Sequence, residues 1–348
     1  MVAHNLAQLV FLSAHKVGNG REGDGLHLSD SFQQINAENL QETLKRYFLS
    51  HFNTPEFFSF TFSNGDFKMN PMFRFVDNIF RDPEDLHEQS RNMAQLLFEC
   101  SDHPNVKPGD LYVAYFEKVN VDNITTNAVG IFKAENKDAF LKLQDEGGQL
   151  QLVQETGINI DKLDKGCLVL NTNADNGYKI CTIDKSSRGG EAQYWRDDFL
   201  KLRPLADAYF FTQNFLTVTK NFVTQQLTEE FEVTKADQID LLNKSVEYFK
   251  TADKFIEEEF VQSVFGDKEV GDSFKKFTQE SFEYMDDTFP TDFEISNQAV
   301  KKQARVFKSV LKLDKNFHIY IHGNKELIEK GVDENGRKFY KIYYTEET

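Results

Sequence analysis

The residues best suited to chemistry in this chain are cations concentrated near its C-terminal end. The segment from Lys301 to Lys325 carries seven Lys and Arg side chains and one acid, Asp314, so its net charge is 7 − 1 = +6. The whole chain carries a net charge of −16 at pH 7. A basic segment in an acidic protein favours an anionic partner. The alternative is a solvated basic face that balances an acidic neighbour.

The spacing of these cations predicts a helix. Phosphate contacts are expected from six of them: Lys301, Lys302, Arg305, Lys308, Lys312 and Lys315. Four of the six, from Lys301 to Lys312, recur at intervals of four, three and four residues, which is one helical face. Val306, Val310 and Leu313 would form a matching apolar stripe. We therefore expect an amphipathic helix that directs its cations to solvent.

A second candidate phosphate site is the polar loop that follows a strand predicted to end at Asp184. It offers Lys185, Ser187 and Arg188 as donors and two consecutive glycines, and a helix is predicted from about Glu191. Helix N-termini expose unpaired N–H groups, and glycines allow close backbone approach, so this combination suits a phosphate. The GxxxxGK[ST] pattern of nucleotide-binding loops is absent, and an ordinary capped turn is the alternative.

Other residues give weaker predictions. Trp195 is expected to anchor its helix on the sheet, with stacking on a base as the alternative. His318 and His322 lie four residues apart, but no further ligands follow at a zinc-site spacing. No nucleophile elbow, HExxH or kinase signature is present. We expect no catalytic residues, no metal and no cofactor, although a nuclease-like carboxylate cluster assembled across the sequence stays open.

The composition is that of a globular protein with ample core material. Of its 348 residues 40% are hydrophobic, and 34 are phenylalanine. Its three cysteines, Cys100, Cys167 and Cys181, lack CxxC spacing, so reduced thiols in a cytoplasmic protein are expected. No apolar run reaches the ~18 residues of a membrane span, and no basic region precedes the first apolar run as in a signal peptide.

The patterning predicts an α+β protein. Its N-terminal part is expected to hold an antiparallel β-sheet with flanking helices: a strand at 5–14, helices at 37–52 and 84–100, and a meander of about five strands over 109–183, with Asn176-Gly177 as a hairpin turn. The C-terminal part is expected to be mainly helical and to end in a small β-hairpin that carries a short helix at 324–331. A boundary near Arg203-Pro204 divides the chain into 1–203 and 204–348.

Two sequence blocks resemble the bacterial 37-kDa nucleoid-associated protein family. One is the strand–loop–helix KICTIDKSSRGGEAQYWRDDFLKL, and the other is FEYMDDTFPTDFEISNQAVKKQARVFKSVLKLDKNFHIYIHG continuing to GRKFYKIYY. The resemblance implies a cytoplasmic protein of the bacterial nucleoid that binds DNA, contacts other chromosome-bound proteins and has no established catalytic centre. The acidity of this chain departs from that of abundant nucleoid packagers, which are usually basic.

Two functions compete on these observations. The first is non-enzymatic binding of double-stranded DNA, with RNA as the alternative nucleic acid, through mainly sequence-independent phosphate contacts. The second is an interaction or regulatory protein whose acidic helices at 229–287 bind protein partners on the chromosome. The segment Glu229–Glu294 holds nineteen acids and seven basic residues, net 7 − 19 = −12. The phenylalanine-rich amphipathic helices also suggest a homodimer, and no membrane partner is expected.

Overall fold

The structure is a computed structural model. It describes residues 2–3, 5–35, 37–63, 65–102, 106–121, 124–185, 194–283, 290–305, 307, 310–321 and 327–346. The chain forms two compact units, Met1–Leu205 and Ala206–Thr348, and each is presented by itself.

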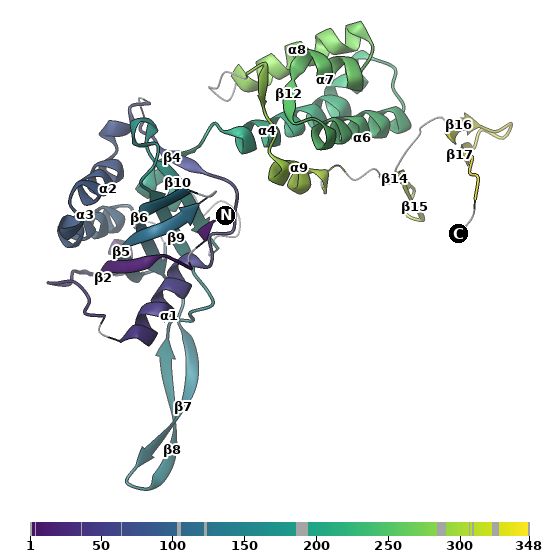
Figure 1. The fold of residues 1–348 in the computed structure, drawn as a ribbon. Helices are drawn as coiled ribbons and strands as arrows, with labels where there is room; N and C mark the ends of the chain where they lie inside the picture. Colours follow the sequence, from purple (N-terminus) through teal and green to yellow (C-terminus); the bar gives the residue numbers. More distant parts are fainter. Residues whose placement is uncertain are drawn as a thin grey trace. The chain divides into compact units, whose positions relative to one another are not determined.

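An antiparallel sheet organises the first unit (Figure 1). Its strands are β1 (Val2–Ala3), β2 (Gln8–Val17), β3 (Leu26–His27), β4 (Phe58–Phe60), β5 (Gly109–Val121), β6 (Ile124–Ala134), β9 (Lys165–Leu170), β10 (Lys179–Asp184) and β11 (Leu202–Pro204). Their order is β11-β4-β10-β9-β6-β5-β2-β3, and β1 also pairs with β5. The antiparallel sheet predicted from the sequence is therefore confirmed. Its central strand β9 reads KGCLVL and is buried throughout, because helices cover both faces of the sheet.

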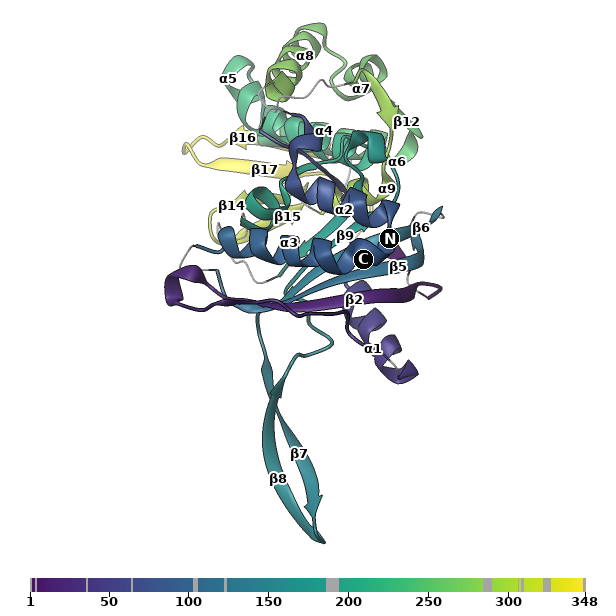
Figure 2. The same cartoon turned by 90° about the vertical axis from the view of Figure 1, so that its left-hand side faces the viewer.

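Helices cover both faces of this sheet. α1 (Glu38–Leu49) lies on one face, while α2 (Pro71–Arg81) and α3 (Leu86–Glu99) lie on the other (Figure 2). Side chains alternate between the two cores along each strand. Cys167 therefore packs in the core under α2 and α3, whereas Cys181 on the next strand packs under α1. Both are buried and neither forms a disulfide, as expected for small core residues.

The predicted hairpin at Asn176-Gly177 joins β9 to β10. Gly177 has φ +85°, a conformation that favours glycine. A Cβ added there would lie 2.8 Å from the carbonyl oxygen of Phe60, and the Phe60 amide donates to the Gly177 carbonyl at 2.9 Å. This turn therefore also carries the pairing between β10 and β4.

One predicted strand of the meander lies elsewhere. Residues 149–155 belong to β8 (Gln149–Gly157), which pairs only with β7 (Asp138–Glu146) among the described residues. The two strands form a ribbon, inserted between β6 and β9, that extends away from the body of the first unit (Figures 1 and 2). The sequence prediction of a strand was right, but its place in the sheet was wrong.

The second unit is a helical bundle with a phenylalanine core. It contains α4 (Ala208–Asn221), α5 (Leu227–Glu230), α6 (Lys235–Thr251), α7 (Glu257–Val264), α8 (Lys268–Glu283) and α9 (Asn297–Ala304), with β12 (Lys254–Ile256) paired to β13 (Asp292–Glu294). Phe215 lies at its centre, with the ring of Phe255 at 4.4 Å and that of Phe260 at 5.0 Å. Many of the phenylalanine rings that suggested a dimer face pack inside this core instead, where eight of them, including Phe215 and Phe274, are buried.

The chain ends in two hairpins. β14 (Val310–Leu313) pairs with β15 (Phe317–Tyr320), and β16 (Ile328–Val332) pairs with β17 (Lys338–Ile342). The terminal β-hairpin and the α+β class are confirmed. The sequence predicted that its last two predicted strands, which correspond to β15 and β17, pair with each other. That pairing was wrong, because β15 pairs with β14 and β17 pairs with β16. The short helix predicted at 324–331 was also wrong where the chain is described, because Ile328–Val332 is a strand.

Candidate nucleic-acid interface

The candidate loop in the first unit begins at Lys185, directly after β10. The Lys185 side chain is exposed, and its Nζ lies 3.3 Å from Nδ1 of His51. Burial, and then the nearby Lys185 charge, lower the pKa of His51. Ser187 and Arg188 lie outside the described residues. Lys185 is therefore the one candidate of this loop whose position is described.

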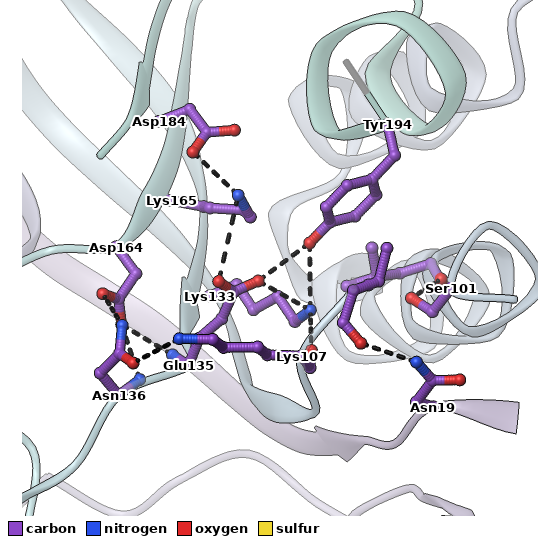
Figure 3. Close-up of polar contacts among 12 residues, drawn as sticks. Asn19, Ser101, Lys107, Lys133, Glu135, Asn136, Asp164, Lys165, Asp184 and Tyr194 are labelled. Carbon is purple, nitrogen blue, oxygen red and sulfur yellow. Dashed lines mark hydrogen bonds and ion pairs between the residues drawn. The ribbon is translucent and has the colours of Figure 1, made fainter. Parts of the chain in front are cut away.

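A cluster of buried ionic side chains contacts the residues that flank this candidate loop, Asp184 before it and Tyr194 after it (Figure 3). Asp184, the last residue of β10, forms an ion pair with Lys165 at 2.8 Å. Tyr194, the first residue of the π-helix Tyr194–Leu200, donates its hydroxyl to Glu135 at 2.9 Å. Lys133 forms an ion pair with Glu135 at 3.0 Å, so residues on both sides of 185–193 bond to one cluster.

Two lysines form the centre of this cluster. Lys133 on β6 and Lys165 on β9 are paired directly across the strands, and their side chains are 0% and 2% exposed. Like charges in such a pair are destabilising unless anions compensate them. Burial lowers the pKa of Lys133, while Glu135 acts in the opposite direction. Burial and Glu135 raise the pKa of Tyr194 well above its usual value, so Tyr194 stays a neutral donor.

Trp195 does not present a face for stacking on a base. It is 0% exposed and packs against Phe199 with ring centroids 5.1 Å apart. The predicted role as a core anchor is confirmed.

The cations of the second unit do not share one helical face. α9 ends at Ala304, and Lys301 and Lys302 lie in its last turn, followed by Arg305 at its C-cap. Lys312 lies on strand β14, and Lys315 lies in the turn to β15. The predicted helix over 301–313 was therefore wrong at 310–313, which form a strand, while Val306 and Lys308 lie outside the described residues. Residues 310–313 form a strand because their apolar side chains have the two-residue spacing of a strand. Leu311 and Leu313 precede the turn, and Ile319 lies opposite Leu311 after it.

The hairpin β14–β15 separates apolar from polar side chains. Leu311 and Ile319, which are cross-strand neighbours, face a small core that includes Ile239 of α6. Lys312 pairs with His318 on the opposite face, and Tyr320 projects from that face with 62% exposure. One face of the hairpin thus presents a cation beside exposed rings.

The basic residues divide into paired and unpaired sets. In the acidic region, Lys244 pairs with Asp240 at 3.0 Å, and ion pairs also engage Lys250, Lys254, Lys275 and Lys276. Within the described ranges, no ion pair joins Lys301, Arg305, Lys312 or Lys315 to a carboxylate, and all four are exposed. Lys302 differs, because its Nζ donates to the Tyr209 hydroxyl at 3.0 Å. The second unit therefore presents exposed cations that no described acid neutralises.

Comparison with known protein families decides the relationship. A family model described as nucleoid-associated protein YejK matches residues 13–337. The chain belongs to this nucleoid-associated protein family. The match spans both units and includes the first block, from which the resemblance was inferred, and the second block as far as Arg337, so the family prediction is confirmed. The curated proteins contain no match to the chain. Among the residues that the structure describes, no helix is long and apolar enough to cross a membrane.

The buried cluster is the part of this nucleoid-associated protein that sequence reasoning missed. Lys133 and Lys165 lie in the apolar runs GIFKA and KGCLVL, where a strand buried on both faces has no solvent for a cation. A lysine in a fully buried strand indicates that counter-ions are buried beside it. The sequence alone could not identify the residues around the two lysines, because Glu135, Asp184 and Tyr194 come from separate parts of the chain.

Proposed function

We propose that this chain is a non-enzymatic DNA-binding protein of the cytoplasmic nucleoid. It contacts duplex phosphates, mainly without regard to sequence, through a basic surface of the second unit. We define this basic surface by Lys301, Lys302, Arg305, Lys308, Lys312 and Lys315. A secondary contact is assigned to Lys185, Ser187 and Arg188 of the first unit. The observation that carries the proposal is the set of exposed cations without a described acidic partner, in a member of the nucleoid-associated family.

The energetics favour phosphate as the ligand. A cation already paired with a carboxylate must lose that pair before it binds a phosphate, whereas Lys301, Arg305, Lys312 and Lys315 have no described ion pair to lose. Each phosphate neutralised releases counter-ions and contributes about −0.9 to the slope of log K against log salt on duplex DNA. Contacts from these four residues alone therefore predict a slope of about −3 to −4.

The hairpin face adds contacts that are not electrostatic. Tyr320 and His318 beside Lys312 offer rings to sugars or unpaired bases. Such rings tolerate RNA as well as DNA, so RNA is included as an alternative ligand.

The test replaces cations of the basic surface while keeping the fold. A Lys301→Gln, Arg305→Gln, Lys312→Gln triple variant should bind a random-sequence duplex at least ~10-fold more weakly, with a salt slope smaller in magnitude by about 2 to 3. The matched control is Lys244→Gln, Lys250→Gln, Lys276→Gln, which removes three cations of the same unit that already have acidic partners. Equal losses in both variants would contradict the assigned surface.

The alternative function is that of an acidic interaction protein that binds partners on the chromosome. The net charge of −12 over Glu229–Glu294 supports it, and five of the seven basic residues of that region are engaged in ion pairs. Partners that remain bound after nuclease treatment of an extract would favour this function over DNA binding.

A catalytic role is not part of the proposal. Within the described part of the chain, no group of three or more His, Cys, Asp or Glu side chains is arranged to hold a metal ion. Incubation of plasmid DNA with the protein and Mg²⁺ or Mn²⁺ should leave the DNA intact, and cleavage that follows the protein through purification would contradict the non-enzymatic assignment.

A further inference from the structure

The terminal hairpin β16–β17 has an outer face that the proposed function does not use (Figure 1). Its inner face is already occupied, because Ile328 of β16 and Tyr340 of β17 pack against the small core that includes Leu311. Successive side chains of a strand point to opposite faces, so the neighbours of Tyr340 point away from this core. Packing on one side thus leaves the other side of the hairpin open to solvent.

The outer face of β17 alternates rings and a cation. Phe339 and Lys341 lie on it, and Tyr343 continues the alternation one residue beyond the strand. The ladder still holds Tyr343, because its amide donates to the Leu327 carbonyl at 2.8 Å. Phe339 is 44% exposed and Tyr343 is 40% exposed. We call Phe339, Lys341 and Tyr343 the ring face.

The backbone of the hairpin fixes the first ring. Phe339 pairs directly across the strands with Gly331. A Cβ added to Gly331 would lie 2.4–3.0 Å from three atoms of the Phe339 ring, so the ring lies over the glycine and fills the space of its missing side chain. One side of the ring is therefore held against the backbone, while the ring as a whole stays half exposed.

The cation between the rings is available to an anion. The Nζ of Lys341 lies 4.7 Å from the centroid of the Tyr343 ring. Its carboxylate neighbour is Glu329 on β16, 3.9 Å away, and both side chains are exposed. An exposed ion pair of this kind stabilises the fold little, so a phosphate can replace the carboxylate at small cost.

The chemistry of the ring face selects a single strand of nucleic acid. Every base has a face that stacks on an aromatic ring, and the phosphate that joins two bases pairs with a lysine. Residues 336–344 contain three cations and no acid, net 3 − 0 = +3. An apolar protein surface would bury Lys341 without supplying an anion, which is costly. A duplex supplies phosphates, but it keeps its bases stacked inside.

We propose that the ring face binds unpaired bases of single-stranded nucleic acid. Phe339 and Tyr343 each stack on one base, and Lys341 contacts a phosphate between them. The two rings are four residues apart, ~13 Å along the strand, so they take separate bases and do not clamp the same one. DNA and RNA share this chemistry. The site is independent of the basic surface, which contacts duplex phosphates.

The test removes the rings and keeps the charge. Fluorescence anisotropy with the full chain uses labelled oligothymidine and oligouridine of ~12 nucleotides, beside the random-sequence duplex. Phe339→Leu with Tyr343→Leu should weaken oligothymidine binding at least ~10-fold and change duplex binding by less than ~2-fold. The matched control is Tyr344→Leu, which removes an exposed ring outside the ring face and should change either affinity by less than ~2-fold.

Three results would overturn the proposal: no binding of either oligonucleotide at low salt, full affinity in the double variant, or an equal loss with Tyr344→Leu. Ring-dependent binding of both strands is expected, and ring-dependent binding of one strand alone supports the site and identifies its ligand as DNA or RNA. Failure of duplex binding would contradict the basic surface and leave ring-dependent binding of single strands unaffected. The two proposals therefore fail separately.

Photo-cross-linking of the unsubstituted chain avoids reliance on the folding of a variant. An oligothymidine that carries 5-iodouracil cross-links, when irradiated, to aromatic rings on which the base stacks. Mass spectrometry of the digested adduct should place the cross-link on Phe339 or Tyr343. Cross-links confined to other rings of the chain would contradict the assigned face.

Discussion

At the scale of single residues, the most constrained feature is the cluster of buried ionic side chains in the first unit. Lys133 and Lys165 oppose each other across β6 and β9 and are stable there only with anions beside them. Glu135, whose side chain is 3% exposed, contacts both lysines and accepts from Tyr194. The sequence indicated lysines in apolar strands, but it gave no means to assign their partners.

This cluster predicts a large cost for a small substitution. Glu135→Gln removes the anion shared by the two lysines and should lower the free energy of unfolding by about 3–5 kcal/mol. Urea unfolding followed by Trp195 fluorescence measures it. The control is Glu155→Gln, which breaks the exposed pair with Lys142 and should cost about 0–1 kcal/mol. A cost below ~1 kcal/mol for Glu135→Gln would mean that water solvates the cluster.

His15 predicts how stability depends on pH. Its Nδ1 accepts from the Ser29 amide and its Nε2 lies 2.8 Å from the Ser90 hydroxyl, so the neutral ring fits this site. Burial, and then the charges of His87 and Arg91, lower the pKa of His15 to about 4.

The unfolded state, with a pKa of 6.5, binds more protons than the folded state between pH 6.5 and about 4. The free energy of unfolding should therefore fall as pH decreases through this window. Urea midpoints at pH 7 and pH 5 should differ less in His15→Gln than in the wild type. An identical pH dependence in the two proteins would show that His15 does not titrate with this shift.

At the scale of elements, the sequence predicted most helices and sheet strands but not two of their pairings. Short β-rich runs separated by turn residues identified β5, β6, β9 and β10, and helical stripes of apolar residues identified α1 and α3. The cation spacing of 301–312 imitated a helix, while the apolar alternation over 311–321 indicated the strands that form. Periodicity of exposed charge is a weaker signal than periodicity of apolar residues, because only apolar residues are fixed by burial.

Gly177 gives a test of the hairpin that sequence reasoning identified. Gly177→Ala adds both the strain of a left-handed backbone and a contact with the Phe60 carbonyl, and should lower the free energy of unfolding by about 2–4 kcal/mol. Gly65→Ala, at φ +79° with nothing within 4 Å of its added Cβ, isolates the backbone contribution of about 1 kcal/mol. Equal losses in chemical denaturation would show that the β4–β10 contact adjusts to the methyl group.

At the scale of the whole molecule, charge is segregated. The chain carries −16 overall, yet Lys301, Arg305, Lys312 and Lys315 have no acidic partner among the described residues, and the acidic helices neutralise most of their own lysines. The residues of the candidate interface could be proposed from the sequence, because the sequence shows which residues are charged. Its geometry could not, because it depends on where α9 ends and the hairpin β14–β15 begins.

The central claim is that the second unit binds duplex phosphates through its basic surface. Its most direct test is fluorescence anisotropy of a labelled random-sequence duplex titrated with the full chain over a series of salt concentrations. The account predicts binding at low salt that weakens linearly in log K against log salt, with a slope of about −3 to −5. Absence of binding at low salt, or affinity indifferent to salt, would contradict it and favour a protein partner for the acidic helices.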